Sequence, residues 1–552
     1  MSITKYLQDA PYVAVDTEGY PYHYCLGIST SIDRVTEYFP VGHVAGDNIS
    51  QTQFSELKDG LQGVNCLIFH NAKHDLQALA KAGIPYDGPF VDTMLMTHMI
   101  DENIYSKALD YLGKKYLDET KKPFFWSGDP DIDRMYHPNT VEEYARHDAY
   151  MAEKLFYKLK PEYEQQFDDK LWDWEQKWTR LVGKIEQNGI LVDQNFCQEQ
   201  LDYGLNIMGD IKETLGFNPS SPKELGQFFL EDMGMQPVKK TKKNKPSFDK
   251  YALEVYDELL QLSGDPRADL VLTYRGWQKT TSSNYKPYLE LRHGDGRLHP
   301  NFKIHGTKTG RLSCEHPNLQ QIPRESEKKW NGALKKAFIV ESGRTAWELD
   351  YSQLEFRLAA AYAGEERLLE IFRDPNRDLF SEMAKDLGLN RFQTKTLNYT
   401  MMYGGGVDRV STVFGVSVPA AKAIINNYYG KYPGLRKISK LAEERARDRG
   451  YVKFWTGRRR HFQWPEQEAR KAFNSAIQGG AFEIVKRAMI IGDEAGLNND
   501  ECRIDLQVHD SIRLDIEEGK ESIYVPEWQH VMENVIQFPQ VKFKVEAKKW
   551  AV

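Results

Sequence analysis

Short apolar runs alternate with amphipathic stretches in the first 160 residues of the chain. Residues 11–16 and Cys66–Phe69 are predicted to form two buried strands, because both runs are short and apolar. A helical period follows over Lys73–Ala82. Strands that alternate with helices predict a compact α/β unit in this part of the chain.

Helices dominate the middle of the chain, and strands return near its end. One helix is predicted from about Lys170 to Asn188, and residues 195–290 are mostly helical. The segment Asn218–Pro222 and a lysine-rich loop interrupt this helical pattern. Strands are predicted at Thr345–Asp350 and, as a hairpin, over Ile504–Ile516. The full pattern predicts an α/β multidomain protein.

The composition narrows the class of protein but does not indicate its function. A chain of 552 residues is long enough for about two to four domains, each with its own core. No apolar run is long enough for a membrane span, and the first ten residues lack the pattern of a secretory signal. The five cysteines form no CxxC pair, which indicates reduced thiols in the cytoplasm and neither a disulfide framework nor a zinc site.

The charge distribution is more informative than the formal net charge of −7, which taken alone argues against a nucleic-acid partner. Lysines crowd the run Lys239–Lys245, and Arg458-Arg459-Arg460 forms a second basic run. Such runs are usually solvated loops. They become phosphate contacts only where other residues bring nucleic acid close.

Two carboxylates stand at the end of the first predicted strand, in Asp16-Thr17-Glu18. Alternation along an extended chain points Asp16 and Glu18 to the same side, where both can bind a hard divalent cation. The motif is short enough to arise by chance, so a solvated strand end is the alternative interpretation. Its neighbours along the chain decide between the two.

Further acidic residues follow in an order that suits a hydrolase using two metal ions. Asp75 opens the helix after the second strand, and Tyr144 and Asp148 lie one turn apart on a predicted helix. Such a hydrolase needs several carboxylates and a group that orients water, but no protein nucleophile. The predicted metal ligands are Asp16, Glu18, Asp75 and Asp148, and Tyr144 would orient the water.

These motifs resemble the DEDD family of 3′→5′ exonucleases over roughly residues 10–160. The tyrosine branch fits, because Tyr144 stands four residues before Asp148, whereas the histidine branch would have His where Glu143 stands. The resemblance implies an RNase H-like domain that binds the 3′ end of single-stranded DNA.

Four motifs in the second half carry chemistry of another kind. Two could be structural on their own: Thr307–Ser313 with Pro317–Gln320 could be a loop, and Asp350 could hold a metal, cap the helix that follows it, or do both. In the third, Arg391, Lys395 and Tyr399 form one helical stripe followed by Tyr403. Two cations and a ring suit a nucleoside triphosphate, although snorkelling side chains on an amphipathic helix give the same pattern.

The fourth motif, Gln507-Val508-His509-Asp510, lies at the predicted tip of the late hairpin. A hairpin that brings Asp510 beside Asp350 would complete a site for two metal ions. Together the four motifs resemble family A DNA polymerases, the group of bacterial DNA polymerase I and many phage replicases, from about Lys177 to Trp550. The segments 218–225, 457–460 and 470–479 match further family motifs.

The resemblance implies a right-hand polymerase domain with thumb, palm and fingers after the exonuclease domain. The predicted division is: exonuclease 1–165; linker helix and thumb 166–300; first part of the palm 301–375; fingers 376–440; second part of the palm 441–552.

The resemblance also assigns roles to individual residues. Asp350 and Asp510 would bind the catalytic metal ions, two Mg²⁺ in each active site with Mn²⁺ as a substitute. Deoxynucleoside triphosphates would meet a second group: Arg391, Lys395, Tyr399, Tyr403, Glu355 (which excludes a ribose 2′-hydroxyl) and Gln353. Primer–template DNA would meet a third: Arg311, Asn318, Arg470, Asn474, Gln478 and His509.

Three positions depart from the family pattern. Phe380 stands where many members have a triphosphate-binding His, Ser511 stands where Glu is common, and Thr400 stands where Gly is common. These departures predict altered detail in the nucleotide pocket with activity retained, since both aspartates and Lys395 are present. Tyr399, where many cellular members have Phe, predicts ready incorporation of dideoxynucleotides.

The prediction of where the protein comes from rests on analogy with other members of the family. No 5′-nuclease domain is expected before Asp16, and with the compact length and Tyr399 this favours a phage replicative polymerase over a host repair enzyme. The protein is expected to work as a monomer in the cytoplasm, and a processivity or replisome factor is a candidate partner. The alternatives are a nuclease with a DNA clamp, a non-catalytic nucleic-acid-binding protein, and an RNA polymerase, which Glu355 disfavours.

Overall fold

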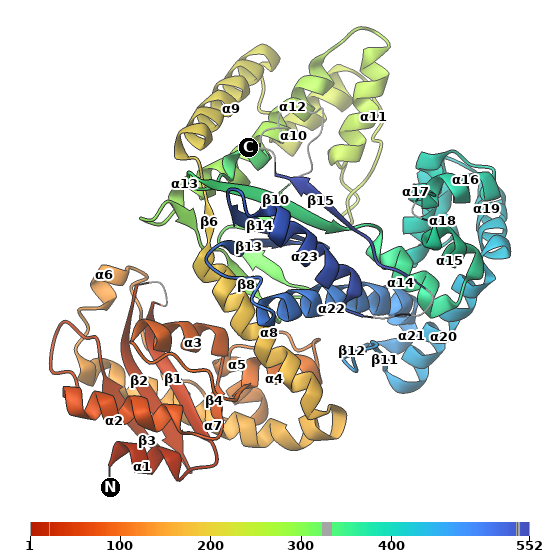
Figure 1. Ribbon diagram of the computed structural model, residues 1–552. Coiled ribbons are helices and arrows are strands. Elements are labelled where there is room, and N and C mark those ends of the chain that lie inside the picture. Colours follow the sequence, from red (N-terminus) through yellow and green to blue (C-terminus); the bar gives the residue numbers. More distant parts are fainter. Residues whose placement is uncertain are drawn as a thin grey trace.

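A computed structural model describes residues 2–20, 23–322, 334–374, 376–536, 538 and 541–550. The predicted palm segment 301–375 therefore lies partly outside the described residues. Figure 1 shows two sheets far apart, a five-stranded one at the lower left and a four-stranded one near the centre. Among the described residues no helix is long and apolar enough to cross a membrane.

The N-terminal sheet is mixed, with strand order β3-β2-β1-β4-β5. Strand β1 runs antiparallel to β2 and parallel to β4. Val13 and Val15 pack into a core with Leu57 and Leu79 on one face, whereas Ala14 belongs to a core on the other face. The elements are β1 (Val13–Tyr20), β2 (Tyr24–Ile32), β3 (Val35–Pro40), β4 (Leu67–Phe69), β5 (Phe90–Asp92), α1 (Ile3–Gln8), α2 (Gln51–Gln62), α3 (Ala72–Lys81), α4 (Thr93–Ile100), α5 (Leu109–Tyr116), α6 (Pro130–Asp133) and α7 (Pro138–Gln166).

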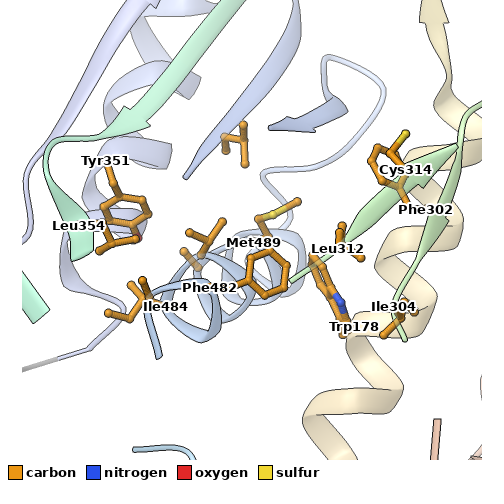
Figure 2. Packing of buried hydrophobic residues seen from close by; sticks show 14 of the residues in the cluster. Trp178, Phe302, Ile304, Leu312, Cys314, Tyr351, Leu354, Phe482, Ile484 and Met489 are labelled. Atoms are coloured by element: carbon orange, nitrogen blue, oxygen red, sulfur yellow. The ribbon is translucent and has the colours of Figure 1, made fainter. Parts of the chain in front are cut away.

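Helix α8 (Asp169–Asn188) links this unit to the rest of the molecule. Asp168 caps its first turn, and Gly189 ends it at φ 57°, a conformation that glycine adopts without strain. Trp178 is fully buried, and its ring meets Phe482 edge-on at 5.8 Å. Figure 2 shows Trp178 between Phe482 and the residues Leu312 and Ile304, which flank the strands β9 and β8, so one core runs from the linker helix into the central part of the molecule.

A helical region rises above the central sheet in Figure 1 and has a small core of its own. Its lysine-rich loop is exposed, and Lys239 forms an ion pair with Asp249 at the surface. The elements here are β6 (Ile190–Leu191), α9 (Gln194–Leu215), α10 (Pro222–Gly226), the π-helix η1 (Gln227–Asp232), α11 (Lys250–Gln261), α12 (Arg267–Thr280), the π-helix η2 (Thr281–Tyr285) and α13 (Lys286–Glu290).

The central sheet is antiparallel, in the order β13-β14-β10-β15. Helix α22 packs beside it and also contacts α8, α14 and α20. The elements are β7 (Arg297–Leu298), β8 (Asn301–Lys303), β9 (Ser313–Glu315), η3 (Leu319–Gln321), η4 (Leu334–Ala337), β10 (Arg344–Tyr351), α14 (Leu354–Ala363), β11 (Tyr451–Lys453), β12 (Arg459–His461), α21 (Pro465–Glu468), η5 (Ala469–Lys471), α22 (Ala472–Glu494), β13 (Cys502–Val508), β14 (Ser511–Glu517), α23 (Glu521–Asn534) and β15 (Val545–Lys549).

A group of helices lies to the right of this sheet in Figure 1. Helices α16 and α17 pack against each other, and α18 packs on α19. The group consists of α15 (Glu366–Arg373), α16 (Leu379–Leu387), α17 (Arg391–Met402), α18 (Val407–Phe414), α19 (Val418–Lys431) and α20 (Pro433–Arg449).

Two local interpretations of the sequence are wrong. Asp350 does not cap the helix that follows it, because α14 begins only at Leu354 and its N-cap residue is Gln353, in a left-handed conformation. The arginine run is not a solvated loop, since Arg458 and Arg460 are almost completely buried and form ion pairs.

Candidate active sites

Three of the four predicted exonuclease carboxylates converge in one cluster. Asp16 and Glu18 come from β1 and Asp148 from α7, and their ligand atoms lie within 4.8 Å of one another. Glu18 and Asp148 are buried, yet Glu18 Oε1 and Asp148 Oδ1 have no hydrogen-bond partner. Buried carboxylate oxygens without partners fit a divalent cation, because such an ion satisfies both charge and coordination.

The pKa shifts of the carboxyl groups in this cluster also fit a site for a divalent cation. Burial, followed by repulsion from Glu18, raises the pKa of Asp16 well above its ordinary value. Burial and repulsion from Asp148 raise the pKa of Glu18 to about 8, and burial raises that of Asp148 to about 6. Without cations the folded protein therefore holds carboxyl groups that resist ionisation at neutral pH.

The fourth carboxylate occupies the same cavity, which has a volume of about 350 Å³, but it lies apart from the cluster of three. Asp75 stands in the first turn of α3 and accepts hydrogen bonds from the Thr17 backbone N–H (3.0 Å) and hydroxyl (2.8 Å). Tyr144 also lines the cavity, one helical turn before Asp148. Its ring packs on that of Phe124 at a centroid distance of 5.0 Å.

The motifs did not reveal two further residues of this cavity. The Lys121 ammonium forms an ion pair with Asp148 and lies 4.6 Å from the centre of the Tyr144 ring, and Trp126 adds an aromatic wall. Both residues precede α6 in a segment without a helical or strand period, so no sequence pattern points to them.

The second pair of aspartates lies on neighbouring strands of the central sheet. Asp350 in β10 faces Ser511 in β14, and the Tyr351 backbone N–H donates to the Asp510 carbonyl oxygen at 3.2 Å. The predicted hairpin is confirmed, with His509 at φ 53° between β13 and β14. The turn therefore places residue 510 directly beside the end of β10.

A hydrogen-bonded group adjoins these aspartates. The Arg311 guanidinium forms an ion pair with Glu355 and lies 3.8 Å from Asp510 Oδ1. The Tyr403 hydroxyl donates to Glu355 Oε2 at 3.3 Å. Arg311 thus links Asp510, a predicted metal ligand, to Glu355, the residue predicted to exclude a ribose 2′-hydroxyl. Gln353 lies two residues before Glu355, at the start of α14.

Helix α17 presents the predicted nucleotide-binding stripe. A capping box between Asn390 and Gln393 begins the helix, and Lys395 is exposed. Arg391 is held by Asp378 through two hydrogen bonds of 2.9 and 3.0 Å. This pair orients the guanidinium at the start of α17.

The three departures from the family pattern have structural counterparts. Phe380 is buried against Phe356 and Tyr399, with ring centroids at 5.5 and 6.3 Å, so it extends the aromatic wall of the pocket. The Thr400 hydroxyl donates to the Thr396 carbonyl oxygen, one turn earlier in α17. The Ser511 hydroxyl donates to the Val508 carbonyl oxygen across the hairpin.

The predicted DNA-binding residues surround the same region. The loop that carries Arg311 packs against α22, because any side chain at Gly479 would meet the Thr309 carbonyl oxygen at 2.9 Å. On this side of the molecule Asn318, Arg470 and His509 are exposed, and Asn474 and Gln478 lie half-buried on α22.

Buried ion pairs join the N-terminal unit to the central region. Arg460 and the His461 backbone N–H both donate to Glu102 Oε1 at 2.6 Å. Arg458 donates to Glu175 of α8 at 3.0 Å, and Lys486 of α22 pairs with the same carboxylate. We call this set of six residues the interdomain clamp.

Sequence comparison finds a family model for each of the two parts of the chain. Residues 197–551 match the description "DNA polymerase family A" and residues 2–164 match "3'-5' exonuclease". The chain belongs to DNA polymerase family A. This assignment confirms the family expected from the motifs and the presence of an exonuclease domain in front of the polymerase domain.

Relatives from family A include DNA polymerase I of Pseudomonas aeruginosa, 29% identical over 93% of this chain and 60% of the relative. Thermostable DNA polymerase I of Thermus filiformis is 31% identical over 73% of this chain and 50% of the relative. The chain thus spans about half to three fifths of the length of these relatives.

A solved structure, described as the POL domain of Pol1 from M. smegmatis in complex with DNA primer-template and dNTP, covers 100% of this chain and 97% of its own. Its TM-score is 0.86 at 24% identity. The likeness confirms the polymerase fold.

Proposed function

We propose that this chain extends a DNA primer by template-directed transfer of deoxynucleotides and trims mismatched 3′ ends with its own 3′→5′ exonuclease. The observation that carries the proposal is the presence of two separate carboxylate sites on two different sheets. Asp16, Glu18 and Asp148 form the first site. Asp350 and Asp510 lie side by side in the second. Membership of family A and the names of the relatives support both activities.

Cations are part of the proposal. Two divalent ions in each site, Mg²⁺ or in its place Mn²⁺, would supply the charge that activates a primer hydroxyl or a water and stabilises the phosphate being transferred or cut. The unpartnered oxygens of Glu18 and Asp148 support this for the exonuclease site.

In the polymerase site, the residues of the chain bind and select the nucleotide. Arg391 and Lys395 would hold the triphosphate, Tyr399 would lie against the sugar, and Tyr403 would line the templating position. Glu355, buried and fixed by Arg311, would exclude a ribose 2′-hydroxyl, which favours deoxynucleotides over ribonucleotides.

DNA would lie across the central sheet, with single-stranded 3′ ends reaching the exonuclease cavity. Arg311, Asn318, Arg470, Asn474, Gln478 and His509 would contact primer and template there. We keep the division into exonuclease, thumb, palm and fingers as part of the proposal; the separate core of the helices above the sheet supports a thumb.

Primer extension with Mg²⁺ tests the two activities separately. We expect Asp350→Ala to lower synthesis by about 10³-fold or more, because it removes a metal ligand, while single strands are still degraded. Asp16→Ala/Glu18→Ala should extend primers normally but leave a mismatched 3′ end untrimmed. Extension by Asp350→Ala at the rate of the unaltered protein would refute the role of Asp350.

Two finer expectations stay predictions. Replication of phage DNA in the cytoplasm of a host is supported by Tyr399 and by analogy alone, and the relatives named above are bacterial enzymes. A monomer assisted by a processivity or replisome factor is likewise a prediction.

A further inference from the structure

A short segment between α5 and α6 lies along α7 and across the exonuclease cavity. Glu119 at its start forms an ion pair with Lys154, and the Lys122 backbone N–H donates to His147 Nδ1 of α7 at 3.4 Å. The Lys121 backbone N–H donates to Asp110 Oδ1 at 3.2 Å. The backbone on both sides of Lys121 is therefore anchored to neighbouring helices, which fixes where its side chain can reach.

The side chain of Lys121 reaches into the cavity. Its ammonium pairs with Asp148 Oδ2 and lies over the ring of Tyr144. Among the described residues that line the cavity, Lys121 is the only lysine or arginine, and its side chain is 28% exposed. A cation in direct contact with a predicted metal ligand must share that ligand with an incoming ion or give it up.

The charge balance of the cavity indicates which group the ammonium would pair with once metal ions are bound. Asp16, Glu18, Asp75 and Asp148 line the cavity and together carry a formal charge of −4 when ionised. Two divalent ions carry +4, so carboxylates and ions cancel. The remaining charge is that of Lys121, and it matches the single negative charge of one phosphodiester group.

We propose that Lys121 exchanges partners in the exonuclease site. Without metal, its ammonium pairs with Asp148 and competes with a divalent ion for that ligand. With metal bound, it binds a non-bridging oxygen of the phosphodiester that is cut, next to the tyrosine that would orient the water. This inference rests on the proposed exonuclease function and deepens it, since none of the motifs includes Lys121.

Lys121→Met tests the exchange, and Lys122→Met is a matched control that removes the same charge one residue later, from a surface pair with Glu143. Mn²⁺ binding is measured by electron paramagnetic resonance in an Asp350→Ala background, which removes the polymerase metal site. Trimming of a single-stranded oligonucleotide is measured at saturating Mn²⁺. Primer extension without the Asp350 change verifies that each variant folds.

The exchange predicts two effects of opposite direction. Lys121→Met should bind Mn²⁺ about tenfold more tightly, because a competing cation is gone, and should trim about 10- to 100-fold more slowly, because a charge on the phosphate is lost. Lys122→Met should change neither property. Lys121→Arg, which keeps the charge, should trim within about threefold of the unaltered protein.

The results that would overturn the inference differ clearly from those expected. Weaker Mn²⁺ binding together with slower trimming would show that Lys121 only supports the local structure, and unchanged values would show no role at all; either overturns the inference. Lys121→Arg as slow as Lys121→Met would also overturn it. If the unaltered protein neither trims nor binds Mn²⁺ at this site, the proposed exonuclease function itself fails.

Discussion

At the scale of single residues, Phe380, Thr400 and Ser511 are the departures from the family pattern in and around the predicted nucleotide pocket. Phe380 closes one side of an aromatic wall that also contains Phe356, Tyr399 and Tyr403. A buried ring cannot donate to a phosphate as a histidine would. Triphosphate binding would therefore depend on Arg391 and Lys395, the two cations of the predicted stripe on α17.

The role of Tyr399 can be tested by removing a single oxygen atom, that of its hydroxyl group. Its hydroxyl can take the place of the 3′-hydroxyl that a dideoxynucleotide lacks, so Tyr399→Phe should increase discrimination against dideoxynucleotides. Loss of one hydrogen bond in a closed site corresponds to about 10- to 100-fold. The ratio of kcat/KM for dATP to that for ddATP measures the effect, and an unchanged ratio contradicts the assigned role.

At the scale of elements, strand β1 and helix α7 together hold charges that repel each other. Glu18 has a pKa of about 8 in the folded protein against an ordinary value of 4.5. Between these values the folded state binds more protons than the unfolded one, so the free energy of unfolding falls as pH rises from about 4.5 to about 8.

This difference predicts a pH-dependent loss of stability in EDTA. From pH 5 to pH 8 the exonuclease region should lose on the order of a few kcal/mol, and Mg²⁺ should restore most of it at pH 8. Calorimetric melting at both pH values, with and without Mg²⁺, measures this. Glu18→Gln should flatten the dependence, whereas Glu143→Gln, an exposed carboxylate on α7, should not. The opposite slope would exclude a raised pKa at Glu18.

The helices and strands were easier to predict from the sequence than the contacts between residues that are far apart along the chain. The hairpin of β13 and β14 and the strand β10 follow from local apolar patterns, and the motifs at their ends locate Asp350 and Asp510. Arg460 and Glu102 are 358 positions apart, so no local pattern indicates that they meet. Lys121 belongs to no motif, so the sequence did not place it beside Asp148, whereas the motifs did bring Asp16, Glu18 and Asp148 together.

At the scale of the whole molecule, the interdomain clamp decides how the two active sites are held relative to each other. Arg460 and Glu102 are buried with 4% and 2% of their side chains exposed. Removing one partner of such a pair leaves an uncompensated charge and costs about 3–5 kcal/mol, far more than removal of a surface pair.

Arg460→Met should therefore loosen the exonuclease domain from the palm. We expect a lower melting temperature and faster limited proteolysis near residues 166–168, with part of the loss recovered in Arg460→Met/Glu102→Gln. Lys471→Met, which breaks a surface pair with Glu468, is the control. A shift no larger than in this control would mean that the clamp contributes little to domain docking.

The clamp also matters for the preparation of a version of this protein without the proposed trimming activity, for example as a sequencing reagent. Cutting the gene before residue 166 would discard Glu102 and expose Arg460, together with apolar surface that now faces α4 and α7. Such a fragment would be prone to aggregate. Point changes in the first strand would leave that surface covered, so they are the safer route to the same reagent.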